Sequence, residues 1–502
     1  MTRRRVGLAG LLVVLAGSAL AGLGQFREVI GTGGASRGEA VVVDADGTSF
    51  VAGDFQADAT SPVLPFISRY DAWGLLQWTL TQFGTSGSTG YGSAALAVAL
   101  LPVSGTVYDV LVGGRVWSGT TTGLDAFLAR LGADGTPIWM VVNQQPGWDE
   151  AIHAIAVAKS GAIWAAGRWE SGGYGQPWVD RFDGSGTPQV PPIVLTDFNN
   201  TENAALGLAV DASGSVYVAG VRAELGNGYD AFLTKITPGS VQQWTITFDG
   251  GVGSTDFATS VAVAPGGDLV VVGGAFGPGT RTDSLIARVS AGGSVLWART
   301  LDGGEKDDDW ATACAIASDG TIYVTGGVDR ATGVFSDIWL ATLDTGGNVL
   351  SELDRNYGGN YVDRGLGLAL GPAGRVWVVG EITDASNVRR MILTEYMPVS
   401  APSTAPVVVE GVAAMPNPFR PRSGGPQDAA GITFRTVPAG AAVRVYTLRG
   451  TLVADLVDTD ADGIIVWNGK DLNGDDAVSG IYAYVVKPTS GAISRGKVVI
   501  IR

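Results

Sequence analysis

One unit recurs along this chain, and the recurrence constrains the fold more than any other feature of the sequence. Each copy has an apolar run, a tight glycine turn, a second apolar run that ends in glycine, a variable loop and two further runs. The glycine that ends the second run occurs seven times, at Gly53, Gly113, Gly167, Gly220, Gly273, Gly326 and Gly380. Seven copies of four short strands predict an all-β fold, a seven-bladed β-propeller.

The copies are out of phase with the ends of the chain. The seventh copy stops after its third run, at residues 391–396, and lacks a fourth. Residues 26–30, followed by GTGG, align with the fourth runs at residues 244–251 (WTITFDGG) and 297–304 (WARTLDGG). We therefore expect the N-terminal strand to close the last blade, which protects two strand edges and joins the first and last blades.

The repeat also carries a family resemblance. Residues 211–220 (DASGSVYVAG) and 229–239 (YDAFLTKITPG) resemble the bacterial β-propeller repeats known as SBBP repeats. The resemblance covers residues 25–397 and implies the propeller fold. It implies little about function, because propellers host many functions.

The beginning of the chain has the pattern of a targeting segment. Arg3, Arg4 and Arg5 precede an apolar stretch at residues 6–16 and a small-residue pattern at residues 19–21. This pattern predicts a secretory signal peptide over residues 1–21, followed by the propeller over residues 22–398. No later stretch predicts a transmembrane segment. We expect a protein that is secreted or displayed on the outer cell surface of a bacterium.

A second, smaller domain is predicted after a linker. Residues 399–410 are rich in proline and serine, and residues 411–502 contain short alternating strands typical of an immunoglobulin-like β-sandwich. The motifs at residues 416–419 (PNPF), 443–453 (VRVYTLRGTLV), 467–475 (WNGKDLNGD) and 496–502 (GKVVIIR) resemble the FlgD-like immunoglobulin domain. They equally resemble the type A C-terminal sorting domain of the type IX secretion system. The second resemblance implies secretion machinery as a partner, and the first a plain structural module.

Charge and cysteine content exclude several classes of protein. The formal net charge is −15, and binding to nucleic acid depends on basic contacts to phosphate, so no nucleic-acid partner is expected. Cys314 is the only cysteine, so the chain has no internal disulfide, and we expect this side chain to be a small buried hydrophobic residue.

The sequence shows no catalytic constellation. His153 is the only histidine and lies in a strand-like run, AIHAIAVA, where a packed or solvated side chain is the expected role. The chain has no Ser–His–acid motif, no HExxH motif and no phosphate-binding loop. We predict a non-catalytic binding or scaffold protein. The alternative is an extracellular carbohydrate-active enzyme with a catalytic propeller, which needs two convergent carboxylates of raised pKa.

Acidic residues suggest cation binding only weakly. Glu150, Asp256, Asp309 and Asp363, with Asn203, recur where the first strand of a copy begins, and we expect them to accept backbone hydrogen bonds in turns. Calcium is the one candidate cofactor. Its candidate ligands are Asp458, Asp460 and Asp462 before Gly463, in a loop whose twelfth position is Gly469 instead of glutamate, and the turn residues Asp471, Asn473 and Asp475.

Aromatic residues give the candidate binding site. Trp78, Trp139, Trp244 and Trp297 recur near the start of the fourth strand, which predicts packing between blades. By contrast, the variable loops contain aromatic residues that do not recur, namely Trp117, Trp148, Trp169 and Tyr174. Variable loops on a rigid scaffold are where recognition usually resides. We predict a ligand site near blades two and three, for an extracellular protein or a glycan.

Overall fold

Antiparallel strands make up nearly all the regular structure of this computed structural model. Its contacts divide the chain into two units, Met1–Val399 and Ser400–Arg502. The predicted signal peptide and linker lie outside the described residues. The structure describes residues 27–30, 34–72, 74–81, 92–105, 107–117, 123–143, 148–171, 174–189, 191–195, 203–224, 228–249, 254–276, 281–302, 308–328, 336–355, 357, 362–384, 386–396, 413–415, 419–421, 431–435, 437, 440–447, 451–458, 463–487 and 494–502.

The first unit is a seven-bladed β-propeller, and each blade is a sheet in which four strands, A to D, follow one another from the centre outward. The first three blades are β2 (Ala35–Val43), β3 (Ser49–Gln56), β4 (Val63–Tyr70) and β5 (Leu76–Leu80); β6 (Ala94–Ser104), β7 (Val107–Val116), β8 (Asp125–Leu131) and β9 (Pro137–Val142); and β10 (Asp149–Val157), β11 (Ile163–Ser171), β12 (Tyr174–Phe182) and β13 (Ile193–Val194).

Blades four to six repeat this arrangement. They are β14 (Ala204–Val210), β15 (Val216–Glu224), β16 (Gly228–Ile236) and β17 (Gln242–Phe248), with β18 (Ser254–Thr255) added parallel to β16; β19 (Phe257–Val263), β20 (Leu269–Phe276), β21 (Thr282–Val289) and β22 (Val295–Leu301); and β23 (Trp310–Ile316), β24 (Ile322–Val328), β25 (Asp337–Leu343) and β26 (Val349–Arg355).

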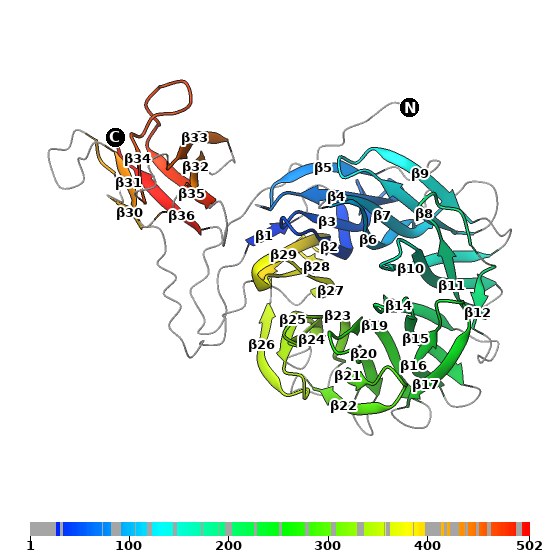
Figure 1. Cartoon of the computed structure of the whole chain (residues 1–502). Helices are drawn as coiled ribbons and strands as arrows, with labels where there is room; N and C mark the ends of the chain where they lie inside the picture. Colours follow the sequence, from blue (N-terminus) through cyan, green and yellow to red (C-terminus); the bar gives the residue numbers. More distant parts are fainter. Residues whose placement is uncertain are drawn as a thin grey trace. The chain divides into compact units, whose positions relative to one another are not determined.

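Blade seven is built from both ends of the domain, as the phase of the repeats predicts. Its strands A to C are β27 (Arg364–Leu370), β28 (Val376–Thr383) and β29 (Arg389–Tyr396), with the short 3₁₀ helix Pro372–Gly374 in the A–B turn. Its outer strand is β1 (Arg27–Ile30), which pairs antiparallel with β29 (Figure 1). The ring is therefore closed by backbone hydrogen bonds between residues far apart in the sequence.

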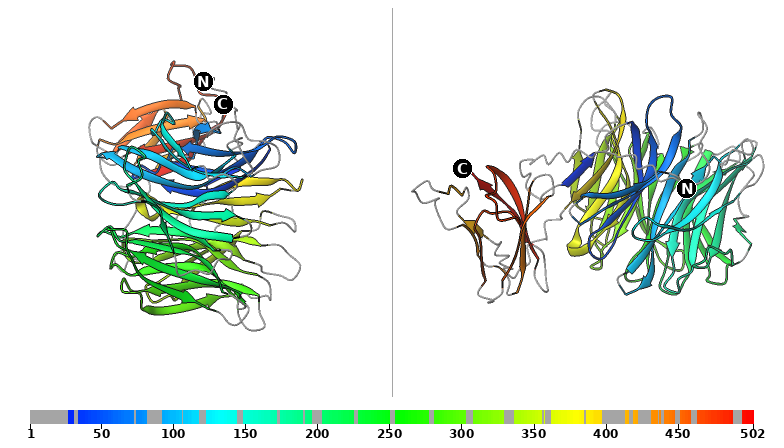
Figure 2. Two further views of the ribbon diagram at one scale, coloured as in Figure 1. Left: turned by 90° about the vertical axis from the view of Figure 1, so that its right-hand side faces the viewer. Right: turned by 90° about the horizontal axis from the view of Figure 1, so that it is seen from above.

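The strands A line the centre of the ring, and the strands of each blade run between its two faces (Figure 1 and Figure 2). Each pair of neighbouring blades shares its own hydrophobic cluster. The pair that closes the ring is no exception, because Val41 and Phe66 of blade one pack with Trp377 and Leu393 of blade seven. Burial between blades, which is proportional to the apolar area removed from water, therefore stabilises the whole circle.

The glycine that marks each repeat is required by a close backbone approach. A Cβ atom at Gly167 would lie 1.9 Å from the Ala151 carbonyl oxygen of strand A, and the equivalent distances in the other blades are similar. The equivalent residue in blade two is Gly114, which pairs with Ala95, so the choice of Gly113 is wrong by one residue. Strand A is bulged at this level, and the displaced carbonyl leaves no room for a side chain.

The recurring tryptophans pack between blades, as predicted. The indole N–H of Trp139 in blade two donates to the Gly184 carbonyl of blade three at 2.9 Å, and Trp78 and Trp297 make the same contact with the next blade. Trp244 packs against Gly293 in the equivalent turn. Cys314 is also buried as expected, and burial raises the pKa of its thiol to about 12.

The second unit is a small immunoglobulin-like β-sandwich. One sheet consists of β30 (Ala413–Met415), β31 (Ile432–Arg435) and β34 (Ile464–Trp467), and the other of β33 (Leu452–Val457), β32 (Ala442–Thr447), β35 (Gly480–Lys487) and β36 (Ser494–Ile500). Phe434, Trp467, Tyr484 and Val498 lie in the core shared by the two sheets. Among the described residues of the whole chain, no helix is long and apolar enough to cross a membrane.

Candidate functional site

A β-bulge at the same place in strand A of every blade turns one side chain out of the regular pairing. The bulged residues are Glu39, Leu96, His153, Leu206, Thr259, Thr312 and Leu366, in blades one to seven. A bulge redirects a side chain and is common beside functional sites. These seven positions can therefore differ between blades without a change in the scaffold.

A second ring of positions separates the blades into two groups. The residue that follows the close-packed glycine of strand B is charged in blades seven, one, two and three and uncharged in blades four, five and six. In the order of the blades from seven to six, these residues are Glu381, Asp54, Arg115, Arg168, Val221, Gly274 and Gly327. The charged residues lie at the end of the strands from which the B–C loops start, on the face that we call the loop face.

In most blades the residue at the start of strand A is used by the fold. Asp256 accepts a hydrogen bond from the backbone N–H of Phe276 at 2.7 Å, and Asn203 and Asp363 accept from the equivalent residues of their own blades. In blade two the hydroxyl of Ser93 accepts from the Trp117 N–H at 3.1 Å. The expectation that these residues accept backbone hydrogen bonds is confirmed for Asp256, Asn203 and Asp363. The shared donor, however, lies in strand B instead of the D–A turn, and Asp363 also accepts from the Tyr357 N–H of the D–A loop.

Glu150 of blade three departs from this pattern. Its side chain is longer, the residue is 1% exposed, and neither carboxylate oxygen makes a hydrogen bond of good geometry to a described residue. Burial, followed by the nearby Asp125 carboxylate, raises the pKa of Glu150 to about 7, against the opposing effect of the Ala126 amide. A buried carboxyl group left unsatisfied is costly, so this position is not explained by the repeat.

Glu150 lies on a polar cavity of about 140 Å³ between blades two and three. The cavity is lined by Arg115, Leu124, Asp149, Glu150, Ala151, His153, Arg168 and Glu170. Asp149 is exposed and accepts a hydrogen bond from the Leu124 N–H at 2.7 Å, so the cavity reaches solvent on that side. A space of this size holds several water molecules or one small ligand.

Charged residues of both signs line this cavity. His153, on the bulge of β10, lies between Arg115 and Arg168, and burial together with these two cations lowers the pKa of His153 to about 4. The imidazole is therefore neutral at physiological pH. Arg168 forms an ion pair with Glu170, whereas Arg115 makes no ion pair with any described residue and its Nε is buried without a hydrogen-bond partner.

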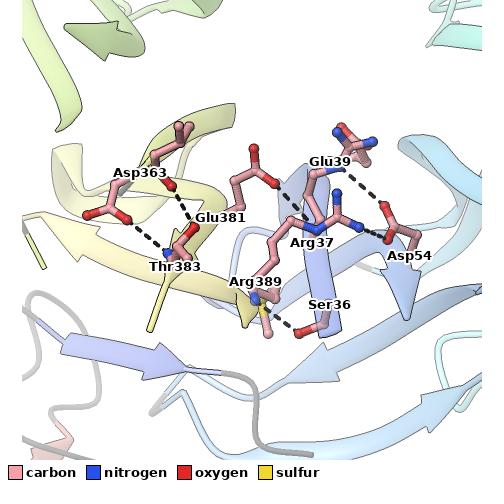
Figure 3. A network of polar contacts seen from close by, with 10 residues as sticks. Ser36, Arg37, Glu39, Asp54, Asp363, Glu381, Thr383 and Arg389 are labelled. Carbon is pink, nitrogen blue, oxygen red and sulfur yellow. Dashed lines mark hydrogen bonds and ion pairs between the residues drawn. The ribbon is translucent and has the colours of Figure 1, made fainter. Parts of the chain in front are cut away.

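A second charged cluster lies where blades seven and one meet (Figure 3). Asp54 binds two guanidinium groups, that of Arg37 at 3.2 Å and that of Arg389 at 2.9 Å. Arg37 also pairs with Glu39, and Arg389 lies 3.6 Å from Glu381. Because three carboxylates share two arginines, one carboxylate is poorly compensated. Burial raises the pKa of Glu39 to about 7, with Asp54 and Glu381 adding to the shift and Arg37 and Arg115 opposing it.

The four predicted aromatic residues are close in sequence to residues that line the cavity, but their side chains differ in exposure. Trp148 and Tyr174 are 36% and 55% exposed. Trp169 is partly buried and stacks on Trp178, with ring centroids 5.9 Å apart, and Trp117 is half-buried. Of the four, only Trp148 and Tyr174 present a large free surface, so they are the stronger candidates for contact with a ligand.

Among the proposed calcium ligands, the side chains of Asp471 and Asp458 accept backbone hydrogen bonds. One oxygen of Asp471 accepts hydrogen bonds from the N–H groups of Asn473 and Asp475 at 2.9 and 3.0 Å, which is the same turn that Asp211 forms in the propeller. Asp458 is buried and accepts from the Gly463 N–H at 3.3 Å. Asp460 and Asp462 lie outside the described residues.

Two sets of three aspartates in blades four to six have carboxylate oxygens close enough together to hold a cation. They are Asp230, Asp249 and Asp256, and, 53 residues later along the repeat, Asp283, Asp302 and Asp309. Asp256 already accepts the Phe276 N–H, and burial with the nearby Asp302 raises the pKa of Asp283. Repetition of the set fits a role in joining strand C to the D–A loop.

The sequence analysis does not predict several charged residues of these two clusters as site residues. They are Arg115, Arg168, Glu170, Glu39 and the arginines of the closure cluster. The residue after each strand-B glycine, which is charged in four consecutive blades, reveals Arg115 and Arg168 but not the other residues of this set. The choice of Gly113 placed Gly114 in that comparison instead of Arg115, and so hid a cation of the cavity lining that forms no ion pair with a described residue.

Comparisons with known proteins assign this chain to no family. No family model matches the chain, and no curated protein sequence matches it. Similar solved structures include PorZ, a surface component of the type IX secretion system of Porphyromonas gingivalis, with 16% identity over 92% of this chain and a TM-score of 0.42. This chain spans 59% of PorZ.

Two others are a protein of unknown function from Dyadobacter fermentans (13% identity, 76% of this chain and 100% of that one, TM-score 0.43) and the polysaccharide lyase Uly1 (11% identity, 72% and 90%, TM-score 0.43). The three structures thus include a secretion component, PorZ, and an enzyme, Uly1. At such low similarity, neither activity is transferred to this chain.

Proposed function

We propose that this protein is a non-catalytic binding protein, secreted or displayed at the bacterial surface, which recognises its ligand on the loop face of blades two and three. The observation that carries the proposal is the cavity beside Glu150. In blades four, five and seven the equivalent polar side chain accepts a backbone hydrogen bond within its own blade. In blade three it faces a space lined by non-repeated charged residues, which the fold does not require.

The surroundings of the cavity also favour recognition. Trp148 and Tyr174 are exposed large aromatic residues of blade three or its D–A loop, and aromatic side chains contribute a large share of the energy at many binding sites. The scaffold beneath them is rigid, since each blade is anchored to its neighbours by a shared core. Extracellular glycans and proteins are the two ligand classes that this combination fits.

The test is a binding screen of the full chain against glycan arrays and surface extracts, followed by biolayer interferometry with variants. Trp148→Ala and Tyr174→Ala should each weaken binding by about tenfold or more. The control is Leu350→Ala, because Leu350 is 61% exposed on the outer strand of blade six. Equal binding by all three variants and the original protein would place the site elsewhere.

The second candidate function is a carbohydrate-active enzyme, and one observation favours it. The pKa of Glu150 is about 7, which suits a general acid at neutral pH, and Glu170 and Asp149 line the same cavity. Incubation with a panel of polysaccharides decides between the two functions. Turnover that Glu150→Gln abolishes supports the enzyme, whereas binding without turnover supports the recognition protein.

The C-terminal sandwich is proposed as an export tail that contacts the secretion machinery, on the strength of its resemblance to type IX sorting domains. Its compact core, including Phe434 and Trp467, supports independent folding. Deletion of residues 411–502 should then leave a folded propeller inside the cell envelope of a host with that system. Normal delivery of the truncated protein to the surface would leave the module a structural role.

A further inference from the structure

We propose that the cavity between blades two and three binds a sugar acid of monosaccharide size, a uronate, with its carboxylate at Arg115 and its hydroxyl groups at Glu150. This inference rests on the proposed binding function and adds the chemical class of the ligand. It follows from the charges that line the cavity, from the groups left without partners among the described residues, and from the exposed Trp148 next to Asp149 of the lining.

The cavity has a cationic end and an acidic end. Arg115 and Arg168, with the neutral His153 near both, form the cationic end, where Arg168 pairs with Glu170 and Arg115 forms no ion pair with a described residue. Glu150, with Asp125 as its neighbouring charge, forms the acidic end. A ligand that satisfies both ends needs an anion at one side and hydrogen-bond donors at the other.

The cationic end favours an organic carboxylate over a metal ion. The guanidinium of Arg115, which forms no ion pair with a described residue, disfavours a divalent cation at this end of the cavity. The planar guanidinium of arginine binds a carboxylate through two parallel hydrogen bonds, and the buried, unsatisfied Nε of Arg115 supplies one of these donors. A ligand carboxylate therefore replaces the partner that Arg115 lacks.

The acidic end favours hydroxyl groups. Both oxygens of Glu150 are buried without a hydrogen bond of good geometry to a described residue, so the carboxylate can accept from two donors at once. Two adjacent hydroxyl groups of a sugar ring supply such a pair of donors. Trp148 precedes Asp149 at the open side of the cavity and is exposed, so its indole is available to pack on the apolar face of the ring.

The experiment is isothermal titration calorimetry on the full chain with D-glucuronate and D-galacturonate. The matched probes are D-glucose and D-galactose, which lack the carboxylate, and glycine and L-glutamate, which offer an ammonium group in place of hydroxyl groups. We expect a uronate to bind at least tenfold more tightly than its neutral sugar and than either amino acid.

Three variants locate the binding. Arg115→Gln should weaken uronate binding by tenfold or more, and Glu150→Gln, which is nearly isosteric, should weaken it several-fold. Arg299→Gln is the control, because it removes the same charge from an exposed arginine on the outer strand of blade five. Thermal unfolding followed by circular dichroism shows whether each variant is folded before its affinity is interpreted.

The outcomes separate this inference from the function beneath it. Equal affinity for a uronate and its neutral sugar, tighter binding of an amino acid, or full binding by folded Arg115→Gln overturns the ligand class. If none of the small probes binds but the glycan and surface screen gives a ligand sensitive to Trp148→Ala, the inference fails and the binding function stands. A blank result in both experiments overturns both.

Discussion

Blades four, five and six differ from blades seven, one, two and three in what their corresponding residues do. In the first group the bulge residues Thr259 and Thr312 donate hydrogen bonds to carbonyl groups of the following blade, at 2.9 and 2.6 Å, so these polar side chains are used by the fold. In the second group the bulges carry Glu39 and His153, which face other charged groups. The same scaffold position is therefore structural in blades five and six and carries an ionisable side chain in blades one and three, while blades two, four and seven have leucine there.

This difference gives a rule for finding function in a repeat protein. A polar residue that recurs and is satisfied within its repeat belongs to the fold, as Asp256 does. A polar residue that occupies the same position but is left unsatisfied, as Glu150 is, indicates a site. The predictions below test whether the two halves share one scaffold and differ only in these side chains.

The largest expected effect is at ring closure, which lies within the group of blades seven, one, two and three. A chain that begins at residue 34 lacks β1, so β29 becomes an open edge with unpaired backbone groups. We expect this truncated protein to aggregate, which size-exclusion chromatography with light scattering measures. The matched control begins at residue 24 and keeps β1. A truncated protein that stays monomeric, with an unchanged melting temperature, would show that β1 is dispensable.

The close-packed glycines should be equally intolerant in both halves. Gly167→Ala in blade three and Gly273→Ala in blade five each place a Cβ 1.9 Å from a strand-A carbonyl oxygen. The backbone must move, and we expect each substitution to lower the free energy of unfolding by about 3 kcal/mol, measured by urea denaturation. Gly266→Ala, in an open turn, is the control. A large difference between the two variants would mean that the halves do not share a scaffold.

The residues at the start of strand A should respond in opposite ways. Asp256→Ala leaves the Phe276 N–H without its 2.7 Å acceptor and should cost about 1–2 kcal/mol of unfolding free energy. Glu150→Gln removes a buried carboxyl group that holds no turn, so stability at pH 8 should be unchanged or higher. Chemical denaturation of both variants measures the contrast. A stability loss in Glu150→Gln as large as that in Asp256→Ala would return Glu150 to a structural role.

The architecture can be predicted from the sequence because each repeat contains the glycines that its strands and turns require. The strand-B glycines, the turn glycines with positive φ, such as Gly214 and Gly267, and the phase of the last repeat together predict seven blades and closure by residues 27–30. The C-terminal sandwich is equally visible in its short alternating strands. These features are local or periodic, and a periodic error, such as Gly113 for Gly114, does not change the fold.

The site is less predictable because it depends on departures from the repeat. Trp148 and Tyr174 lie in variable loops and are found by their irregularity, but the burial of Trp169 against Trp178 depends on packing that the sequence does not display. The cavity depends on Arg115 from blade two meeting Glu150 and His153 from blade three. Their proximity arises from the angle between blades, and no spacing along the chain encodes it directly.

The smallest expected effect is the pH dependence of the closure cluster. The pKa of Glu39 is raised from its ordinary value to about 7, so the folded state holds a proton that the unfolded state has lost. The stability from this proton is complete below the ordinary glutamate pKa and is lost as the pH rises through about 7. Between pH 6 and pH 8 the loss should be about 1 kcal/mol, since Arg37 and Arg115 only partly compensate the charge beside Asp54 and Glu381.

Glu39→Gln isolates this contribution, because the amide cannot ionise. Urea denaturation at pH 6 and pH 8 should show a smaller loss of stability with pH for this variant than for the original protein. Glu352→Gln is the control, since Glu352 is an exposed glutamate in the outer strand of blade six, and it should leave the pH dependence as it is. If Glu39→Gln does not reduce the pH dependence, Arg37 and Arg389 fully compensate the three carboxylates of the closure cluster. The contact between blades seven and one would then have no uncompensated charge, like the contacts among blades four to six.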